Sequence, residues 1–136
     1  DLDRQGAGDQ GMMFGYACRE TDVLMPAPIF WAHAVMAKHA QVMAEGNPDW
    51  LRPDAKAQLT FAYEGVHPVS VHQAVVSTQT ADVSISLVRD FVENEILREV
   101  LPGEWITKAT EILMKIVEGI EDKAPVVTLI NKRDVK

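Results

Sequence analysis

The sequence predicts an α+β fold, in which helices pack on one face of a mostly antiparallel sheet. Strand and helix patterns alternate along its 136 residues. Two neighbouring strand patterns are separated only by turn residues, as in a β-hairpin, and two apolar stripes at helical spacing follow them. Apolar residues make up 47% of the chain and charged residues 24%, so we expect one globular domain.

A strand and a helix are expected first. Met12–Cys18 is short and apolar and is followed by charged residues, which favours a buried strand. Pro28 suits the first position of a helix over Ile29–Glu45, and Gly46 suits its C-terminal cap. Because this helix is apolar on most sides, we expect it to be largely buried.

A hairpin is expected next. After a polar connection over Asn47–Asp54, apolar and polar residues alternate over Leu59–Tyr63, which is the period of a half-buried strand. Turn residues occupy Gly65–Pro68, and the valines within Val69–Val76 continue as a second strand.

Two helices and a strand complete the predicted order. Apolar residues recur every three or four positions over Ser84–Leu101, and the Pro-Gly pair that follows ends this helix. A second stripe over Ala109–Ile120 predicts another helix. The β-branched run Val126–Ile130 predicts a last strand.

Charge and cysteine content narrow the functional classes. The net charge of −7 gives no basic footprint for DNA or RNA, so no nucleic acid is expected as a partner. A single cysteine, Cys18, excludes an internal disulfide and a zinc cluster of thiolates. No apolar run approaches the roughly 20 residues that span a bilayer. The first residues also lack the basic and apolar regions of a signal peptide, so we expect a cytoplasmic protein without a membrane partner.

Glycines cluster near the start of the sequence, where Gly6–Gly11 matches the pattern G-x-G-x-x-G. In a dinucleotide-binding fold these glycines follow a strand and open a helix. Here only five residues precede them and a strand pattern follows, so that fold is not expected. Two interpretations stay open: a turn that needs positive φ angles, and a substrate-binding loop that presents Asp9 to a ligand amine.

A second polar motif, Arg52–Lys56, places an anion between two cations on a backbone stiffened by Pro53. Lys56 could meet a phosphate, and Asp54 could accept a hydrogen bond from a ribose hydroxyl or an adenine amine. The same residues also fit a surface ion cluster, because exposed charge pairs are common.

Other motifs carry little functional weight. Asn131–Asp134 copies the N-K-x-D tetrapeptide of GTPases, but the sequence has no phosphate-binding G-x-x-x-x-G-K-[ST] run. The histidines lack the spacing of a zinc-binding helix and are expected to be polar or core residues: His33, His39, His67 and His72. The tryptophans are expected to be packing residues: Trp31, Trp50 and Trp105.

Six segments together carry a family resemblance. They are GAGDQG at Gly6–Gly11, MFGYA at Met13–Ala17, Glu20–Asp22 with Leu24–Pro28, WLRPDAK at Trp50–Lys56, VVSTQ at Val75–Gln79, and Leu101–Pro102 with Glu104–Trp105. In this order and spacing they closely resemble S-adenosylmethionine synthetase (methionine adenosyltransferase), whose subunit is built from three similar α+β domains. The resemblance is to the central domain and covers Gln5 to about Leu113.

The resemblance implies transfer of the adenosyl group of ATP to the sulfur of L-methionine, yielding S-adenosylmethionine, phosphate and pyrophosphate. It implies Mg²⁺ and K⁺ as cofactors, and a homo-oligomer or pairing with other synthetase chains, since the family's sites lie between subunits. Carried over residue by residue, it implies that Asp9 and Gln10 bind methionine and that Asp54, Ala55 and Lys56 bind ATP. Within this set it makes Asp9 and Lys56 the catalytic residues, with Asp54 at the adenosine and Lys56 at the phosphate chain.

The sequence also departs from the family's pattern. It contains neither a G-H-P-D-K motif nor an N-P-T-G-R-F-like run, and Thr80 stands where the family's histidine is expected. We therefore expect residues 1–113 to form the family-like domain and Met114–Lys136 to be an unrecognised end that packs on it. The predicted function is a synthetase chain with part of the active site, inactive alone. The alternatives are a non-catalytic module that binds nucleotide or S-adenosylmethionine, and a structural fragment derived from the family.

Overall fold

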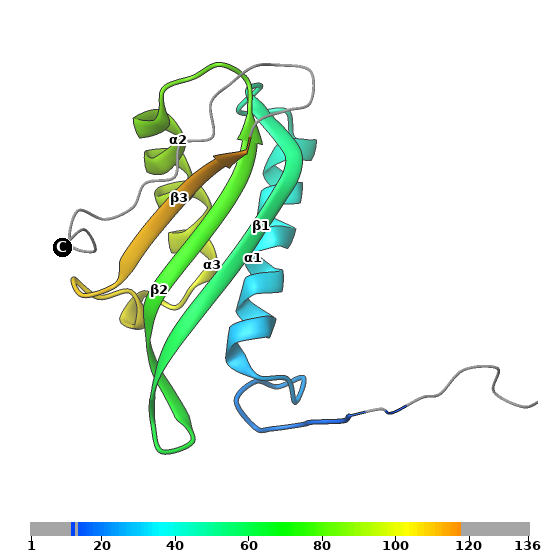
Figure 1. Cartoon of the computed structure of the whole chain (residues 1–136), viewed down its shortest axis with the longest axis vertical. Helices are drawn as coiled ribbons and strands as arrows, with labels where there is room; N and C mark the ends of the chain where they lie inside the picture. The colour runs from blue at the N-terminus through cyan, green and yellow to red at the C-terminus, as the bar shows by residue number, and fades with distance from the viewer. Residues whose placement is uncertain (1–11, 13, 118–136) are drawn as a thin grey trace, which may run out of the picture.

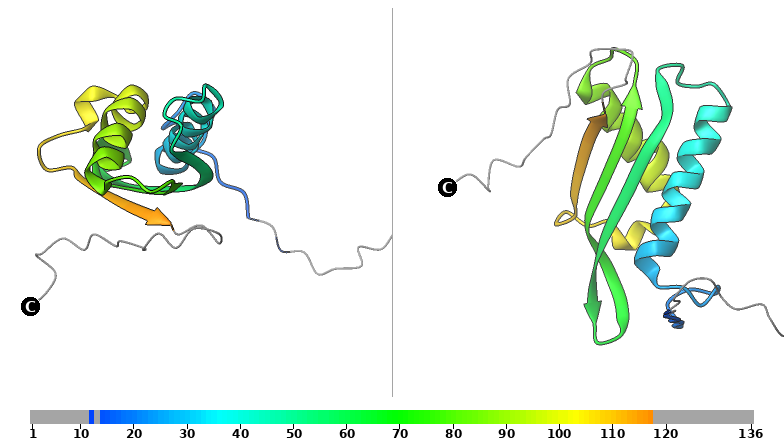
Figure 2. Two further views of the ribbon diagram at one scale, coloured as in Figure 1. Left: turned by 90° about the horizontal axis from the view of Figure 1, so that it is seen from above. Right: turned by 45° about the vertical axis from the view of Figure 1, so that its right-hand side comes forward.

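A three-stranded sheet, covered by helices on one face, forms the body of the protein (Figures 1 and 2). The computed structural model describes residue 12 and residues 14–117. The strands are β1 Leu51–Glu64, β2 His67–Thr80 and β3 Glu111–Val117, in the spatial order β1-β2-β3. The predicted α+β fold with helices on one face is confirmed. The sheet is mixed rather than mostly antiparallel, because β1 and β2 pair antiparallel whereas β2 and β3 pair parallel.

The prediction of a strand over Met12–Cys18 is wrong for the residues of this segment that the structure describes. Its described residues form no strand, and Phe14 and Tyr16 are 90% and 75% exposed. An apolar run becomes a strand only when a neighbouring strand pairs its backbone groups. The segment instead enters a tight loop, in which the Cys18 N–H donates to the carbonyl oxygen of Leu24 at 3.1 Å.

Helix α1, Ala27–Ala44, confirms the first expected helix and begins two residues before Ile29. Pro28 occupies the second helical position rather than the first. At either position a backbone N–H has no partner within the helix, so the missing N–H of proline costs nothing. Gly46, with φ of 71°, follows the C-cap residue Glu45 in the left-handed conformation that glycine adopts at little cost. One side of α1 is buried, at Ala27, Ala32, Val35, His39 and Val42.

Strands β1 and β2 confirm the expected hairpin, and both are longer than expected. β1 begins at Leu51, so half of the expected polar connection belongs to it. Gly65, with φ of 63°, lies in the tight turn to β2. The register shifts between Leu51 and Ala55, around Pro53, and twice more near the turn. Proline has no N–H for the ladder, and an irregular stretch of pairing accommodates it.

The helix expected over Ser84–Leu101 is confirmed in extent but not in type. Ser84 is the N-cap of α2, Ile85–Phe91. A π-helical segment, η2 Val92–Leu97, follows, and α3 Arg98–Val100 ends the stretch. This stretch and the short 3₁₀ turn η3, Gly103–Trp105, form the crossover that two parallel strands require.

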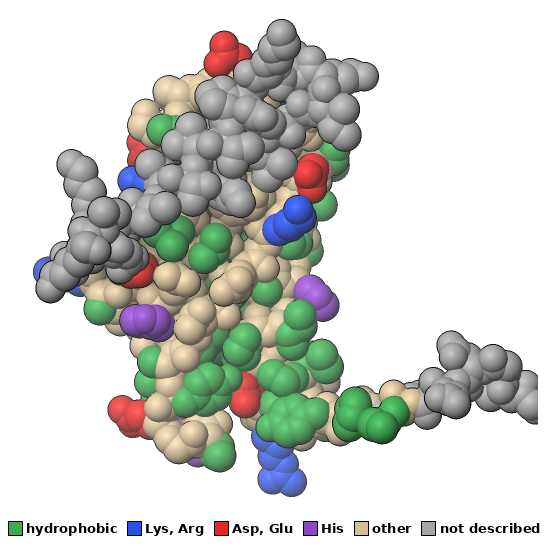
Figure 3. All heavy atoms as spheres, in the orientation of Figure 1, with side chains coloured by type: hydrophobic (Ala, Val, Ile, Leu, Met, Phe, Trp, Pro, Cys, Tyr) green, Lys and Arg blue, Asp and Glu red, His purple; other side chains and the backbone are tan. Residues whose placement is uncertain are grey.

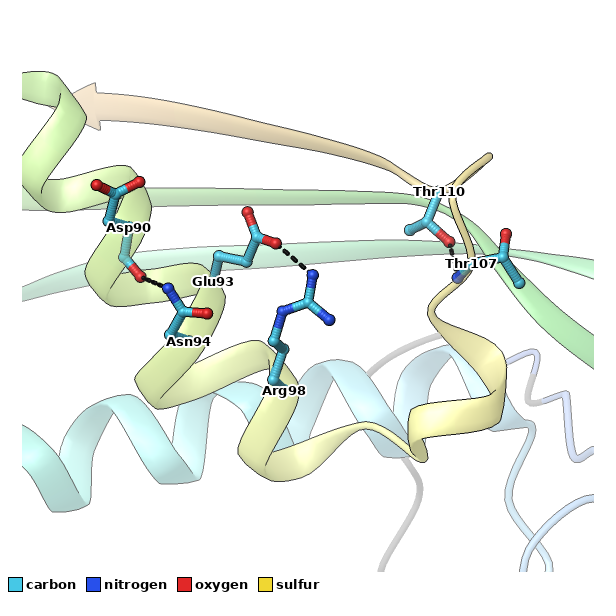
Figure 4. Close-up of polar contacts among 6 residues, drawn as sticks. All are labelled: Asp90, Glu93, Asn94, Arg98, Thr107 and Thr110. Carbon is cyan, nitrogen blue, oxygen red and sulfur yellow. Dashed lines mark hydrogen bonds and ion pairs between the residues drawn. The ribbon is translucent and has the colours of Figure 1, made fainter.

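Two polar contacts of side chains lie along the π-helical segment and its flanking turns (Figure 4). A π-helix brings residues five apart into contact. Glu93 and Arg98, five apart, form an ion pair on the surface. The Asn94 side-chain amide donates to the carbonyl oxygen of Asp90 at 2.8 Å. The contact between Asn94 and Asp90 keeps the four-residue spacing of an α-helix, whereas the pair Glu93 and Arg98 does not follow from the three-and-four spacing that predicted one.

The helix expected over Ala109–Ile120 is wrong, because β3 occupies Glu111–Val117 and pairs with β2. Thr110 ties down the start of β3 (Figure 4). Its hydroxyl donates to the carbonyl oxygen of Val71 at 2.7 Å and accepts from the N–H of Thr107 at 2.9 Å. The apolar run fits helix and strand periods alike, and the open edge of β2 decides between them. The strand expected over Val126–Ile130 lies outside the described residues.

The core lies between the sheet and the helices. Its fully buried apolar side chains come from α1, β2, β3 and the helical crossover: Val35, Val71, Val76, Val88, Val92, Ile96, Leu97 and Met114. Trp105 packs edge-to-face on Trp31 and on Phe61, with ring centroids 5.8 and 5.2 Å apart, and Trp50 packs on Phe91. The packing role expected of the tryptophans is confirmed. Within the described ranges, no helix has the length and apolarity that crossing a bilayer demands.

Candidate functional site

Strand β1 carries the described candidate residues, and two of them, Asp54 and Lys56, lie on the sheet face opposite the helices. Asp54 and Lys56 are exposed, and Ala55 between them is half-buried. Ala55 pairs with Thr78, which is completely buried, whereas Lys56 pairs with Ser77. Because side chains alternate between the two faces of a strand, Lys56 lies on the face that the helices leave open.

Two residues of β2 lie on the same face as Lys56. Ser77 is its cross-strand partner, and Gln79 follows two residues later, half-buried. The amide of Gln79, beside an ammonium group, adds hydrogen-bond donors for an anionic ligand, whereas Ser77 is only 8% exposed. The sequence analysis named both only as part of a matching segment. The period-two alternation along β2, combined with the hairpin register, is the signal that would have found them.

The charges of Arg52–Lys56 do not pair with one another in the structure. Arg52 turns to the backbone instead, and its Nη1 donates to the carbonyl oxygens of Asp49 at 2.7 Å and Leu51 at 3.3 Å. Within residues 14–117, no ion pair involves Asp54 or Lys56. The interpretation as a surface ion cluster therefore has no ion pair to support it in the described part of the chain. The arrangement leaves an ammonium and a carboxylate available to a ligand.

The glycine-rich motif Gly6–Gly11, with Asp9 and Gln10, lies outside the described residues, as does Asn131–Asp134. Their interpretation rests on the sequence alone. Thr80, at the position where the resemblance led us to expect a histidine, is buried at the end of β2 and pairs with Leu51.

Glu20 connects the loop that follows the N-terminal segment to both α1 and β1. One carboxylate oxygen, Oε2, accepts from the backbone N–H of Ala27 at 2.8 Å and from the hydroxyl of Tyr63 at 2.7 Å. The Ala27 N–H, and then the Tyr63 hydroxyl, lower the pKa of Glu20 below its usual value. Desolvation first, and then the bond to Glu20, raise the pKa of Tyr63 to about 12. These two hydrogen bonds therefore fix the direction in which the loop enters α1.

A hollow of about 390 Å³ lies between this loop and the turn of the hairpin, lined by Tyr16, Cys18, Arg19, Glu20, Val66, His67 and Pro68. Hydrophobic side chains gather on the surface around the hairpin end and the start of α1 (Figure 3). Tyr16 and Val66 are both 75% exposed. Lys56 lies seven residues along β1 from Tyr63, or about 20 Å at the rise of a strand. The hollow is therefore separate from the candidate nucleotide contacts.

Metal-ligating side chains do not assemble in the described part of the chain. Among residues 12 and 14–117, no three His, Cys, Asp or Glu side chains come together as a group that could hold a metal ion. His33, His67 and His72 are exposed, and His39 is buried against Thr78. His39 is thus a core residue, and the other three histidines are surface residues.

The sequence was also compared with models of protein families. Residues 4–119, most of the chain, match the family model described as the central domain of S-adenosylmethionine synthetase. The match includes Arg52–Lys56, both strands of the hairpin and the crossover to β3. The chain therefore belongs to the S-adenosylmethionine synthetase family and corresponds to its central domain.

Proposed function

We propose that this chain supplies the adenosine and phosphate contacts of a methionine adenosyltransferase active site. The observation that carries the proposal is the pair of exposed side chains Asp54 and Lys56 on the open face of β1, within the family match. The half-buried Gln79 of β2 lies on the same face, and Ser77, which is 8% exposed, pairs with Lys56. Residues Asp9 and Gln10 would bind methionine, as the resemblance implies.

The proposed reaction forms one bond and breaks one. The sulfur of methionine donates an electron pair to C5′ of ATP and becomes a sulfonium, and the C5′–O5′ bond breaks. That electron pair leaves with the tripolyphosphate, which water then hydrolyses to phosphate and pyrophosphate. Negative charge grows on the leaving chain, so an ammonium at Lys56 would stabilise the transition state more than the ground state.

Other groups have separate roles in this proposal. Asp54 would accept a hydrogen bond from a hydroxyl or amine of the adenosine, and backbone contacts at Ala55 would help to orient it. Asp9 would receive the ammonium of methionine. Mg²⁺ and K⁺, the cofactors implied by the family, would supply further positive charge at the phosphates.

The remaining contacts would come from other synthetase chains or from further copies of this one, in a cytoplasmic oligomer. Tight binding of three phosphates by one lysine is difficult for a chain with a net charge of −7. Additional cationic groups from a partner would relieve this repulsion. The oligomeric mass, measured by light scattering with and without ATP and methionine, tests this part of the proposal.

Calorimetric titration with tripolyphosphate, ATP and methionine tests the binding role. Lys56→Ala should weaken tripolyphosphate binding about tenfold or more, because a hydrogen bond to a charged group is worth about 1.5–3 kcal/mol. Lys108→Ala removes the same charge from an exposed turn residue and should leave the affinity unchanged. Absence of binding for every ligand would refute the proposal and leave a structural fragment.

A further inference from the structure

We propose that His39 is a positioning residue, which holds Lys56 in place through a buried hydrogen bond to Thr78 of β2. The inference rests on the proposed role of Lys56 in phosphate binding. His39 lies on α1 and is 3% exposed, and Thr78 is fully buried. Their Nε2 and Oγ1 atoms are 2.9 Å apart.

The second contact of the Thr78 hydroxyl favours one direction for this hydrogen bond. The hydroxyl donates to the carbonyl oxygen of Gln79 at 3.3 Å. With its hydrogen so placed, Oγ1 accepts from His39 in the tautomer that carries a hydrogen on Nε2. The chain of contacts runs from α1, through Thr78, to the backbone of Gln79, one of the residues that lie on the face of Lys56.

The bond lies directly behind the candidate site. Thr78 is the cross-strand partner of Ala55, and the next pair along the hairpin is Ser77 with Lys56. Ala55–Thr78 is also the first pair after the register shift that follows Leu51. Between Leu51 and Ala55 the residues of β1 have no regular partner in β2. The ladder hydrogen bonds on that side of Ala55 therefore constrain its position weakly. A side-chain anchor from α1 compensates at this point.

The chemistry of the pair also favours a positioning role. A buried histidine costs desolvation that an aliphatic side chain of similar size would avoid. Polar partners inside a core are satisfied in only one alignment, whereas apolar side chains tolerate small slips of strand and helix. The bond between His39 and Thr78 therefore selects one alignment of α1, β2 and, through the hairpin, Lys56.

Two variants that remove the bond test the inference. His39→Leu and Thr78→Val should each lower the affinity for tripolyphosphate about threefold to tenfold, an effect of the size of one neutral hydrogen bond. The double variant should lose no more than either single one. His39→Gln, which retains an N–H donor at similar reach, should restore most of the affinity. Amide hydrogen exchange should become faster at Ala55 and Lys56 in His39→Leu.

A matched variant separates positioning from general loss of stability. Val35→Ala truncates a fully buried side chain one turn earlier on the same side of α1 and should lower stability without changing affinity or the exchange rate at Lys56. Equal effects of Val35→Ala and His39→Leu on both readouts would overturn the inference. If tripolyphosphate does not bind, or Lys56→Ala leaves its affinity unchanged, the proposed function fails. The exchange rates then still decide whether His39 positions Lys56.

Discussion

At the scale of single residues, two ionisable side chains make the stability of this fold depend on pH. Glu20 accepts two hydrogen bonds with one oxygen and links the loop before α1 to Tyr63 of β1. His39 lies in the second half of α1, where it is buried and forms a hydrogen bond with Thr78. The pKa values of both are lowered, by hydrogen bonds in the first case and by desolvation in the second. Both therefore lose stabilising contributions on acidification, in different pH ranges.

Replacement of Glu20 should destabilise the protein in a pH-dependent way. A carboxyl group whose folded pKa is lowered contributes stability above its unfolded pKa, and this is lost as the pH falls through the folded value. Glu20→Gln should therefore be less stable than wild type at neutral pH. The difference should begin to shrink near pH 4.5, the ordinary value, and disappear below it. Urea unfolding against pH measures this, and Asp22→Asn, an exposed change in the same loop, should show no such trend.

Protonation of His39 should lower the stability of the fold at a higher pH than protonation of Glu20 does. Burial lowers its pKa from the ordinary 6.5. Its contribution is complete above that value and is lost as the pH falls through the lowered folded pKa, because protonation is easier in the unfolded chain. Wild type should lose stability over this interval, and His39→Gln should not. His33→Gln replaces an exposed histidine of α1 and should follow wild type. Parallel urea-unfolding curves for all three would contradict the prediction.

At the scale of elements, β3 is the element whose identity depends most on its neighbours. Met114 is 1% exposed and pairs with Val76 of β2, which is fully buried. The adjacent Leu113 is half-buried and belongs to the opposite face. Met114→Ala should therefore cost about 2–5 kcal/mol of unfolding free energy, and Leu113→Ala clearly less. Urea denaturation measures both, and equal losses would argue against the strand assignment.

The π-helical segment should depend little on its surface ion pair. Glu93 and Arg98 have side chains 28% and 49% exposed, so solvent screens their attraction. Arg98→Ala should cost less than about 1 kcal/mol, and the cost should fall with added salt. Thermal unfolding at low and high salt checks this. A larger, salt-independent loss would show that Arg98 acts through packing instead.

At the scale of the whole molecule, the 136-residue polypeptide should bind ligand without turning it over. Transfer needs the reacting atoms aligned at about 3–3.5 Å and the leaving charge neutralised together. Its sequence contains neither the G-H-P-D-K motif nor the N-P-T-G-R-F-like run. Incubation with ATP, methionine, Mg²⁺ and K⁺ should yield no S-adenosylmethionine above background by chromatography. Turnover that Asp9→Asn abolishes would refute this prediction.

Local patterns were sufficient for α1 and for the hairpin. Pro28 and Gly46 mark the two ends of the helix, and Gly65 marks the turn, because proline and glycine restrict the backbone wherever they occur. Arg52–Lys56 and the other matching segments were likewise sufficient for the family, which the match over residues 4–119 establishes. None of these features requires knowledge of distant contacts.

Tertiary structure alone decided the parallel pairing of β3, the π-helical segment and the placement of Lys56 beside Ser77. The apolar run of β3 is compatible with two periods, and only the unpaired edge of β2 selects the strand. The hydrogen bond between His39 and Thr78 joins residues 39 positions apart, so no local pattern predicts it. The physical reason is common to all of them. Periodicity and turn residues act within a few positions, whereas ladder hydrogen bonds and buried polar contacts join segments that meet only in the folded chain.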